Sequence, residues 1–268
     1  MIEPRTVLLL GASGMGMAPL ALYLQGAGVG VEAYDDRFCE PLRSMMMDSG
    51  ITVLSEPTPT TKPDCVIRSS AIKETDKRVR SFLLQGVPVY QRGDFISRLL
   101  EGKSIVAVVG SHGKTSTTGM LVWGLKQINF SFSYLVGGRF KNDSLAPGEW
   151  NRSSVVLLEV DESDGTIDRF SPDYTLALNC EWDHVDHYAD SKAFLKTLGE
   201  LFERTKQGLV FPKGSNIEKL IGKLKFDFNP IAFQPHENPA LFDDSNRRAV
   251  IAMGKSMGVD LGQVDFSL

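Results

Sequence analysis

The chain has 268 residues, enough for two domains of ordinary size, and its 42% apolar and 23% charged residues are typical of globular proteins. A formal net charge of −4 argues against a nucleic-acid partner, and the apolar runs are too short to span a membrane. Three scattered cysteines and an N-terminus without the basic start of a secretory signal suit a reducing compartment, so we expect a cytoplasmic protein with no membrane partner.

The first hundred residues alternate strand-like and helix-like segments. Short apolar runs predict strands at Thr6–Leu10, Val31–Tyr34, Ile51–Leu54, Cys65–Arg68 and Val87–Tyr90. Helices are predicted at residues 17–25 and Pro41–Met47, and SEPTPTTKPD (55–64) is a surface loop by composition. Short apolar strands that alternate with helices indicate a parallel sheet covered on both faces. We therefore expect a Rossmann-like α/β domain over residues 1–102.

A glycine cluster separates the first predicted strand from the first predicted helix; it reads LLLGASGMGM (8–17) and contains Gly11, Gly14 and Gly16. Glycines at such a turn let the phosphates of a ligand approach the backbone and the helix N-terminus. Asp35 and Asp36 follow the next strand at about the spacing of a ribose contact, which keeps NAD open. However, Ser13 stands where the dinucleotide fingerprint has its second glycine. A nucleotide or nucleotide-sugar site and a bare strand–helix turn both fit this cluster.

A second unit opens near Lys103. It contains the predicted strands Ile105–Val109, Val155–Glu159 and Thr175–Leu178, a helix that runs to about Ile128, and a helix-then-strand pattern over 215–233. The loop GSHGKTS (110–116) lies between the first of these strands and the helix. Because this loop has the features of a phosphate-binding loop, we expect residues 103–268 to form a P-loop NTPase-type domain with a parallel sheet.

Backbone N–H groups in a loop such as 110–116 form a cradle for anions. Lys114 is expected against the β- and γ-phosphates of a nucleotide, and the hydroxyl of Thr115 is expected as a magnesium ligand. The general P-loop pattern would need a glycine at Val108, so the loop is the shorter G-x-x-G-K-T, with His112 inside it. If the neighbouring strand is Val155–Glu159, the carboxylate of Glu159 can hold magnesium beside Thr115.

The stretch GSHGKTSTT resembles the ATP loop of the Mur ligases, and among them the branch that adds L-alanine or a murein peptide to UDP-N-acetylmuramate. Further stretches agree in order and spacing, namely GASGMGM (11–17), RSSAI (68–72), LLEVDESDGTI (157–167) and LNCEWDHVDHY (178–188). The resemblance runs from residue 6 to about 212. It implies a UDP-sugar-binding domain over 1–102 and a shortened central ATP-binding domain over 103–268.

The activity that the resemblance implies is an ATP-dependent, ADP-forming carboxylate–amine ligase of peptidoglycan precursor synthesis. In such enzymes ATP phosphorylates a carboxylate and an amine attacks the acyl phosphate. The implied cofactors are ATP and Mg²⁺, and the implied substrates are a UDP-N-acetylmuramate-type nucleotide sugar and L-alanine or a peptide. A ligase of the folate–polyglutamate kind shares the central domain, but the N-terminal UDP-type domain argues against it.

The resemblance also assigns residues to the sites. For the UDP-sugar these are Gly11, Ser13, Gly14, Met15, Gly16, Asp35, Ser69, Ser70 and Ala71. For ATP they are Gly110, Ser111, His112, Gly113, Lys114, Thr115, Ser116 and Asn246. Catalytic roles go to Lys114, Glu159 and His184, and the metal ligands are Thr115, Glu159 and His184. A zinc site in the cluster Asp183–His187 is disfavoured because two histidines three apart, without a cysteine, make a poor tetrahedral set.

Past Pro212 the chain departs from the family pattern. Asn246 matches the last asparagine of a family segment that contacts adenine, but Phe242 and Asp243 replace its histidine and first asparagine. The sequence ends at Leu268, where the ligases would begin a third domain that closes over ATP. We therefore expect binding of the UDP-sugar but poor ligase activity from the isolated chain. A homodimer, a partner chain that supplies the missing domain, and a non-catalytic regulatory module all stay open.

Overall fold

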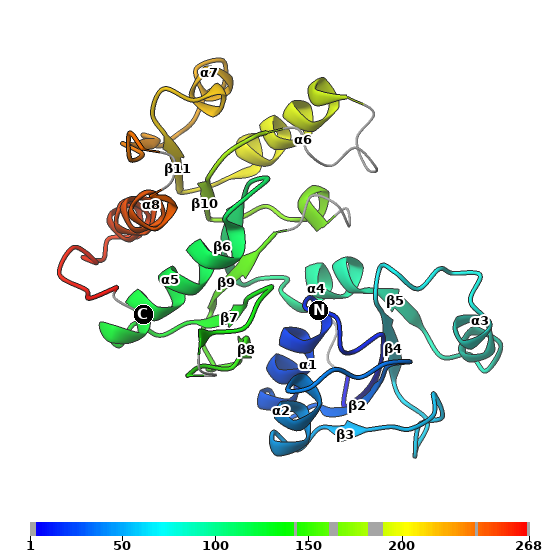
Figure 1. The fold of residues 1–268 in the computed structure, drawn as a ribbon. Coiled ribbons are helices and arrows are strands. Elements are labelled where there is room, and N and C mark those ends of the chain that lie inside the picture. Colours follow the sequence, from blue (N-terminus) through cyan, green and yellow to red (C-terminus); the bar gives the residue numbers. More distant parts are fainter. Residues whose placement is uncertain (1–3, 142–143, 161–165, 182–189, 239–240, 267–268) are drawn as a thin grey trace. The chain divides into compact units, whose positions relative to one another are not determined.

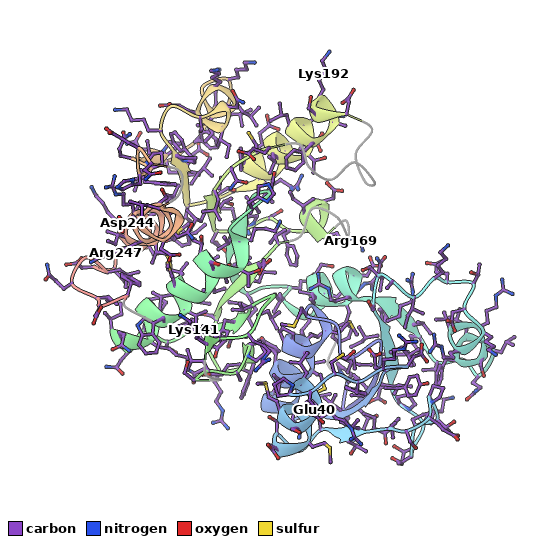
Figure 2. The ribbon with its side chains drawn as sticks, viewed as in Figure 1. Glu40, Lys141, Arg169, Lys192, Asp244 and Arg247 are labelled. Atoms are coloured by element: carbon purple, nitrogen blue, oxygen red, sulfur yellow. The ribbon has the colours of Figure 1, made fainter. Side chains whose placement is uncertain are left out.

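The computed structural model describes residues 4–141, 144–160, 166–181, 190–238 and 241–266 (Figures 1 and 2). The chain divides into two compact units. Unit 1 consists of Met1–Gly102 with Ser133–Ser153, and unit 2 consists of Lys103–Phe132 with Ser154–Leu268. One boundary between the units lies at 102/103, and residues 133–153, although they lie between two segments of unit 2 in the sequence, group with unit 1.

Unit 1 is built on a five-stranded parallel sheet in the order β3-β2-β1-β4-β5 (Figure 1). The strands are β1 (Thr6–Leu10), β2 (Gly30–Tyr34), β3 (Thr52–Val53), β4 (Cys65–Arg68) and β5 (Val89–Gln91). The helices are α1 (Met17–Gly26), α2 (Leu42–Asp48), α3 (Lys77–Leu84) and α4 (Arg92–Leu99). One face of the sheet packs against α3 through a cluster that contains Leu8, Val66 and Phe82.

Unit 1 also contains a short antiparallel pair, β7 (Ser133–Leu135) and β8 (Gly148–Glu149). Strand β8 contacts α1, whose residues Met17–Leu24 are all buried. A Cβ on Gly148 would lie only 2.1 Å from the carbonyl oxygen of Pro19, so only glycine permits this approach. This backbone-to-backbone packing is why residues 133–153 belong with unit 1.

Unit 2 contains five parallel strands in the order β12-β11-β10-β6-β9. They are β6 (Ser104–Val109), β9 (Val155–Glu159), β10 (Tyr174–Ala177), β11 (Gly208–Pro212) and β12 (Ile231–Phe233). The helices are α5 (Lys114–Gln127), α6 (Ser191–Arg204), α7 (Asn216–Ile221) and α8 (Phe242–Ser256), with a 3₁₀ turn at Thr166–Arg169. Helix α8 packs on α5 and on β11. Strand β6 lies between β10 and β9, so the loop that follows it has a strand end on either side.

The predicted fold class, a Rossmann-like α/β domain followed by a P-loop-type domain with a parallel sheet, is confirmed. Every predicted strand recurs within two residues at each end; the largest changes are that Ile51–Leu54 shortens to Thr52–Val53 and Val87–Tyr90 shifts to Val89–Gln91. Helices α3, α4 and α6 and strand β11 were among the elements not predicted; the three helices mix charged and apolar residues without a long apolar run. None of the described helices is long and apolar enough to cross a bilayer.

Candidate functional site

The glycine turn of unit 1 is tied to the end of strand β2. Gly11 has a φ of +77°, and the backbone N–H groups of Gly11 and Ala12 both donate to the carbonyl oxygen of Tyr34, at 2.9 and 3.1 Å. The N–H of Ser13 donates to a carboxylate oxygen of Asp35 at 2.9 Å. A Cβ on Gly11 would lie 2.9 Å from the Cβ of Ser69, so the turn passes very close to the segment after β4. The carboxyl ends of three neighbouring strands therefore meet at this turn.

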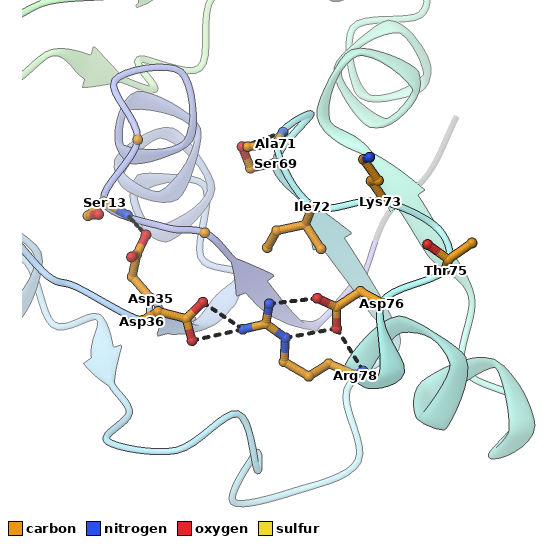
Figure 3. Close-up of a pocket in the computed structure, with 12 residues that line it drawn as sticks. Ser13, Asp35, Asp36, Ser69, Ala71, Ile72, Lys73, Thr75, Asp76 and Arg78 are labelled. Carbon is orange, nitrogen blue, oxygen red and sulfur yellow. Dashed lines mark hydrogen bonds and ion pairs between the residues drawn. The ribbon is translucent and has the colours of Figure 1, made fainter.

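A pocket of about 590 Å³ opens at this edge of the sheet (Figure 3). The structure brings six of the predicted UDP-sugar residues into its lining, namely Gly11, Ser13, Gly14, Asp35, Ser69 and Ala71. The lining does not include the predicted Met15, Gly16 and Ser70. Gly16 instead lies against another helix, because a Cβ there would be 3.0 Å from the guanidinium of Arg92.

Six residues of the pocket lining were not among the predicted UDP-sugar contacts: Asp36, Ile72, Lys73, Thr75, Asp76 and Arg78. The sequence analysis had named Asp36 only as a possible ribose contact and Ile72 only as part of RSSAI. Most of these residues lie after β4 or at the start of α3, and their place depends on the pairing of β4 with β1. One local signal was available, since Asp76 is a typical N-cap residue and its carboxylate accepts from the N–H of Arg78 at 2.8 Å.

Arg78 joins two carboxylates across the pocket (Figure 3). Its guanidinium contacts both oxygens of Asp36 at 3.0 Å and reaches Asp76 at 2.7 Å. Hydrogen bonds from Arg78 lower the pKa of Asp76 to about 2. A hydrogen bond from the Tyr34 hydroxyl, and then Arg78, lowers the pKa of Asp36. Arg78 therefore compensates these two carboxylates, and Lys73 adds a further cation to the lining.

The phosphate-binding loop predicted in unit 2 lies between β6 and α5. Gly110 and Gly113 have φ values of +145° and +78°, which disfavour any residue with a side chain. Lys114 is the first residue of α5, and its Nζ donates to the carbonyl oxygen of Gly110 at 2.6 Å. The lysine therefore folds back across the loop, with its charge at the N-terminus of the helix. Ser116 lies exposed on the first turn of α5.

Thr115 and Glu159 meet at the carboxyl ends of two neighbouring strands. Strands β6 and β9 pair with Val108 opposite Glu159, as the sequence analysis required. The hydroxyl of Thr115 lies 3.0 Å from each carboxylate oxygen of Glu159. A hydroxyl and a carboxylate are oxygen donors of the kind that Mg²⁺ prefers, so these two residues fit the ion that the family resemblance implies.

Two further predicted residues of this site are Asn246 and His184. Asn246 on α8 lies next to the loop, because its Oδ1 is 3.6 Å from the point where a Cβ of Gly113 would be. His184 lies outside the described residues, as do its neighbours in 182–189. Among the residues that the structure does describe, no three His, Cys, Asp or Glu side chains are grouped to hold a metal ion.

The segment after β10 contacts the loop at several points that the sequence did not indicate. The side chain of Asn179 accepts from the N–H of His112 and donates to its carbonyl oxygen, both at 2.9 Å. The hydroxyl of Ser111 donates to the carbonyl oxygen of Glu181. The imidazole Nε2 of His112 lies 3.7 Å from the Glu181 carboxylate. Residues that follow three adjacent strands thus surround the loop.

Known proteins resemble this chain in sequence and in fold. The family described as the Mur ligase middle domain matches residues 108–253. The UDP-N-acetylmuramate–L-alanine ligase of Kineococcus radiotolerans is 32% identical over 205 residues, which are 75% of this chain and 43% of that protein. The chain thus spans less than half the length of this curated relative.

Two solved structures share the fold. One is the UDP-N-acetylmuramate:L-alanyl-γ-D-glutamyl-meso-diaminopimelate ligase of Neisseria meningitidis, with 20% identity and a TM-score of 0.82 over 97% of this chain and 95% of that one. The other is the UDP-N-acetylmuramate–alanine ligase of Thermotoga maritima, with 22% identity and a TM-score of 0.80 over 97% of this chain and 66% of that one. At these identities the likeness concerns the fold alone.

Proposed function

The chain belongs to the Mur ligase family, and from this premise we propose that it takes part in the ATP-dependent, ADP-forming attachment of L-alanine to UDP-N-acetylmuramate. The choice of L-alanine follows from the name of its 32% identical relative. A murein peptide as the amine substrate is the alternative, and the assay below distinguishes the two.

The observation that carries the proposal is the contact between Thr115, at the start of α5, and Glu159, at the end of β9, next to the loop that Lys114 folds across. Phosphoryl transfer requires positioning and charge neutralisation more than covalent chemistry from the protein. Lys114 would neutralise the β- and γ-phosphates of ATP, and Thr115 and Glu159 would hold Mg²⁺. The ion, when bound, would supply positive charge against the negative charge that develops during transfer. The predicted third ligand, His184, remains a prediction.

In unit 1 we assign the pocket to the nucleotide-sugar rather than to NAD. A dinucleotide site uses the acid after the second strand to accept the hydroxyls of a ribose. Here the two oxygens of Asp35 accept from the backbone N–H groups of Ser13 and Arg37, both at 2.9 Å. The carboxylate therefore acts as a brace for the glycine turn. Arg78 is already bound to Asp36 and Asp76, so Lys73 is the cation of the lining that we assign to the phosphates of such a ligand.

The test is an assay of ADP release, with the amide product followed by mass spectrometry. ATP, Mg²⁺ and UDP-N-acetylmuramate are supplied with L-alanine, with murein tripeptide, or with neither. Amide formation with L-alanine supports the proposal, and product with the tripeptide alone moves the chain to the peptide-adding branch. If both ligands bind and no amide forms, the non-catalytic binding module is supported instead. Tighter calorimetric binding of NAD than of UDP-N-acetylmuramate would refute the assignment of unit 1.

A further inference from the structure

We propose that Asn179 is a positioning residue that holds the loop 110–116 in its phosphate-binding conformation before a nucleotide arrives. The inference rests on the nucleotide-binding role proposed above for this loop. It concerns a residue to which the sequence analysis assigned no role. The contacts that support it all lie within unit 2.

The side chain of Asn179 makes two hydrogen bonds with the backbone of one residue. Its Oδ1 accepts from the N–H of His112, and its Nδ2 donates to the carbonyl oxygen of His112, both at 2.9 Å. The N–H and the carbonyl belong to the two peptide groups on either side of the His112 Cα. The pair of bonds therefore restrains both backbone torsions at the middle of the loop. A carboxamide can do this because it carries a donor and an acceptor side by side.

The backbone around Asn179 supports the same contact. A Cβ on Gly110 would lie 3.1 Å from the N of Asn179 and 3.3 Å from its carbonyl oxygen, so the two segments approach at backbone distance. The hydroxyl of Ser111 donates to the carbonyl oxygen of Glu181. Residues 110–112 thus lie along residues 179–181, and the asparagine amide is the central contact between them.

The His112 side chain is 55% exposed, so side-chain burial does little to hold the middle of the loop in place. Mobile loops lose conformational freedom when they bind, and this loss reduces affinity. Two hydrogen bonds that form in the nucleotide-free protein reduce that loss in advance. The expected consequence of removing them is a weaker nucleotide affinity, with a smaller effect on the fold of unit 2.

The test compares Asn179→Ala with Asn216→Ala, which changes an exposed asparagine at the start of α7 in the same unit. Amide hydrogen exchange is measured on the nucleotide-free protein, and ADP affinity is measured by calorimetry. We expect Asn179→Ala to speed exchange at the His112 N–H and to weaken ADP binding about ten- to a hundredfold, as two hydrogen bonds would. We expect Asn216→Ala to change neither.

A second variant separates the two hydrogen bonds. Asn179→Asp keeps an acceptor for the His112 N–H but places a carboxylate against the His112 carbonyl and near the polyphosphate site. It should keep the slow exchange at His112 and still lose ADP affinity, which mere unfolding of the segment would not produce. Unchanged His112 exchange in Asn179→Ala would overturn the inference, and so would faster exchange with unchanged ADP affinity. If the unmodified protein bound no ADP, the proposed function would fail, and with it the part of the inference that concerns nucleotide. The exchange data would still decide whether Asn179 holds the loop.

Discussion

Both units place a glycine turn between a parallel strand and the helix that follows it, yet the two turns obtain their positive charge differently. In unit 2 the loop contains its own cation, Lys114, at the first position of α5. In unit 1 the turn GASGMG contains no lysine or arginine, and the cations of the pocket, Lys73 and Arg78, come from the segment after β4. A local motif therefore reveals the first kind of site, whereas the second kind depends on the assembled sheet.

The two turns also differ in the group that braces them. The N–H of Ser13 is bound by a carboxylate, that of Asp35, whereas the N–H of His112 is bound by the neutral amide of Asn179. The amide of Asn179 adds no negative charge to its loop, whereas the carboxylate of Asp35 does. We infer that unit 2 is suited to the denser charge of a triphosphate and unit 1 to a ligand with fewer phosphate charges.

The largest effect is expected from Lys114→Ala, which removes the cation of the unit 2 loop. Charge-assisted bonds to phosphate are strong, so affinity for ATP with Mg²⁺ should fall by roughly 1.5–3 kcal/mol, or about ten- to 150-fold. Binding of UDP-N-acetylmuramate should stay unchanged. The control is Lys192→Ala, because Lys192 points away from the sheet at the start of α6 (Figure 2). Calorimetry that finds equal nucleotide affinity in both variants would show that the loop does not hold phosphate.

A smaller effect is expected from Glu159→Gln. The amide keeps the shape of the side chain but is a weaker ligand for Mg²⁺, so ATP affinity should fall roughly tenfold when Mg²⁺ is present. In EDTA the variant and the unmodified protein should bind ATP alike. The matched control is Glu203→Gln, an exposed acid on α6. An equal loss of affinity with and without Mg²⁺ would contradict the metal role of Glu159.

In unit 1, Arg78→Met should reduce stability by about 1 kcal/mol at neutral pH, since it removes partially exposed ion pairs. The folded pKa of Asp76 is about 2, below its ordinary value of 3.8, so its contribution is present above pH 3.8 and is lost as the pH falls toward 2. The melting-temperature difference between variant and unmodified protein should therefore shrink over that interval. Arg80→Met, on the exposed face of α3, is the control. A difference that stays constant from pH 7 to pH 2 would exclude this linkage.

The smallest effect is expected from Lys73→Ala. Lys73 lines an open pocket, where water screens its charge, so affinity for UDP-N-acetylmuramate should fall only about two- to fivefold. Affinity for ATP should not change, which makes this variant the counterpart of Lys114→Ala. A calorimetric titration with both ligands checks it. A larger loss for ATP than for the nucleotide-sugar would argue against the separation of the two sites.

Sequence reasoning succeeded where the structure is determined by residues that lie close together in the sequence. The turns at Gly11 and Gly113 and the strands before them follow from apolar runs and glycine. The pairing of Thr115 with Glu159 could also be anticipated, because parallel strands end at the same edge. In contrast, Arg78 and Asn179 have no local signature of their roles. Each is brought to its turn by a strand from elsewhere in the chain, β4 and β10 respectively.

The assignment of residues 133–153 illustrates the same limit at the level of domains. Their place in unit 1 depends on the approach of Gly148 to Pro19, two residues far apart in sequence. In the sequence the segment lies between two parts of unit 2, and it carries no motif that assigns it to unit 1. Its position could be found only from the assembled backbone.

The central claim is that the two turns are separate sites for different ligands, and hydrogen exchange with each ligand tests it most directly. UDP-N-acetylmuramate should slow exchange at residues 11–14 and 69–78 more strongly than at 110–116. ATP with Mg²⁺ should slow exchange at 110–116 and 179–181 more strongly than at 11–14. Protection of 110–116 without protection of 11–14 by the nucleotide-sugar, or of 11–14 without protection of 110–116 by ATP, would contradict the account.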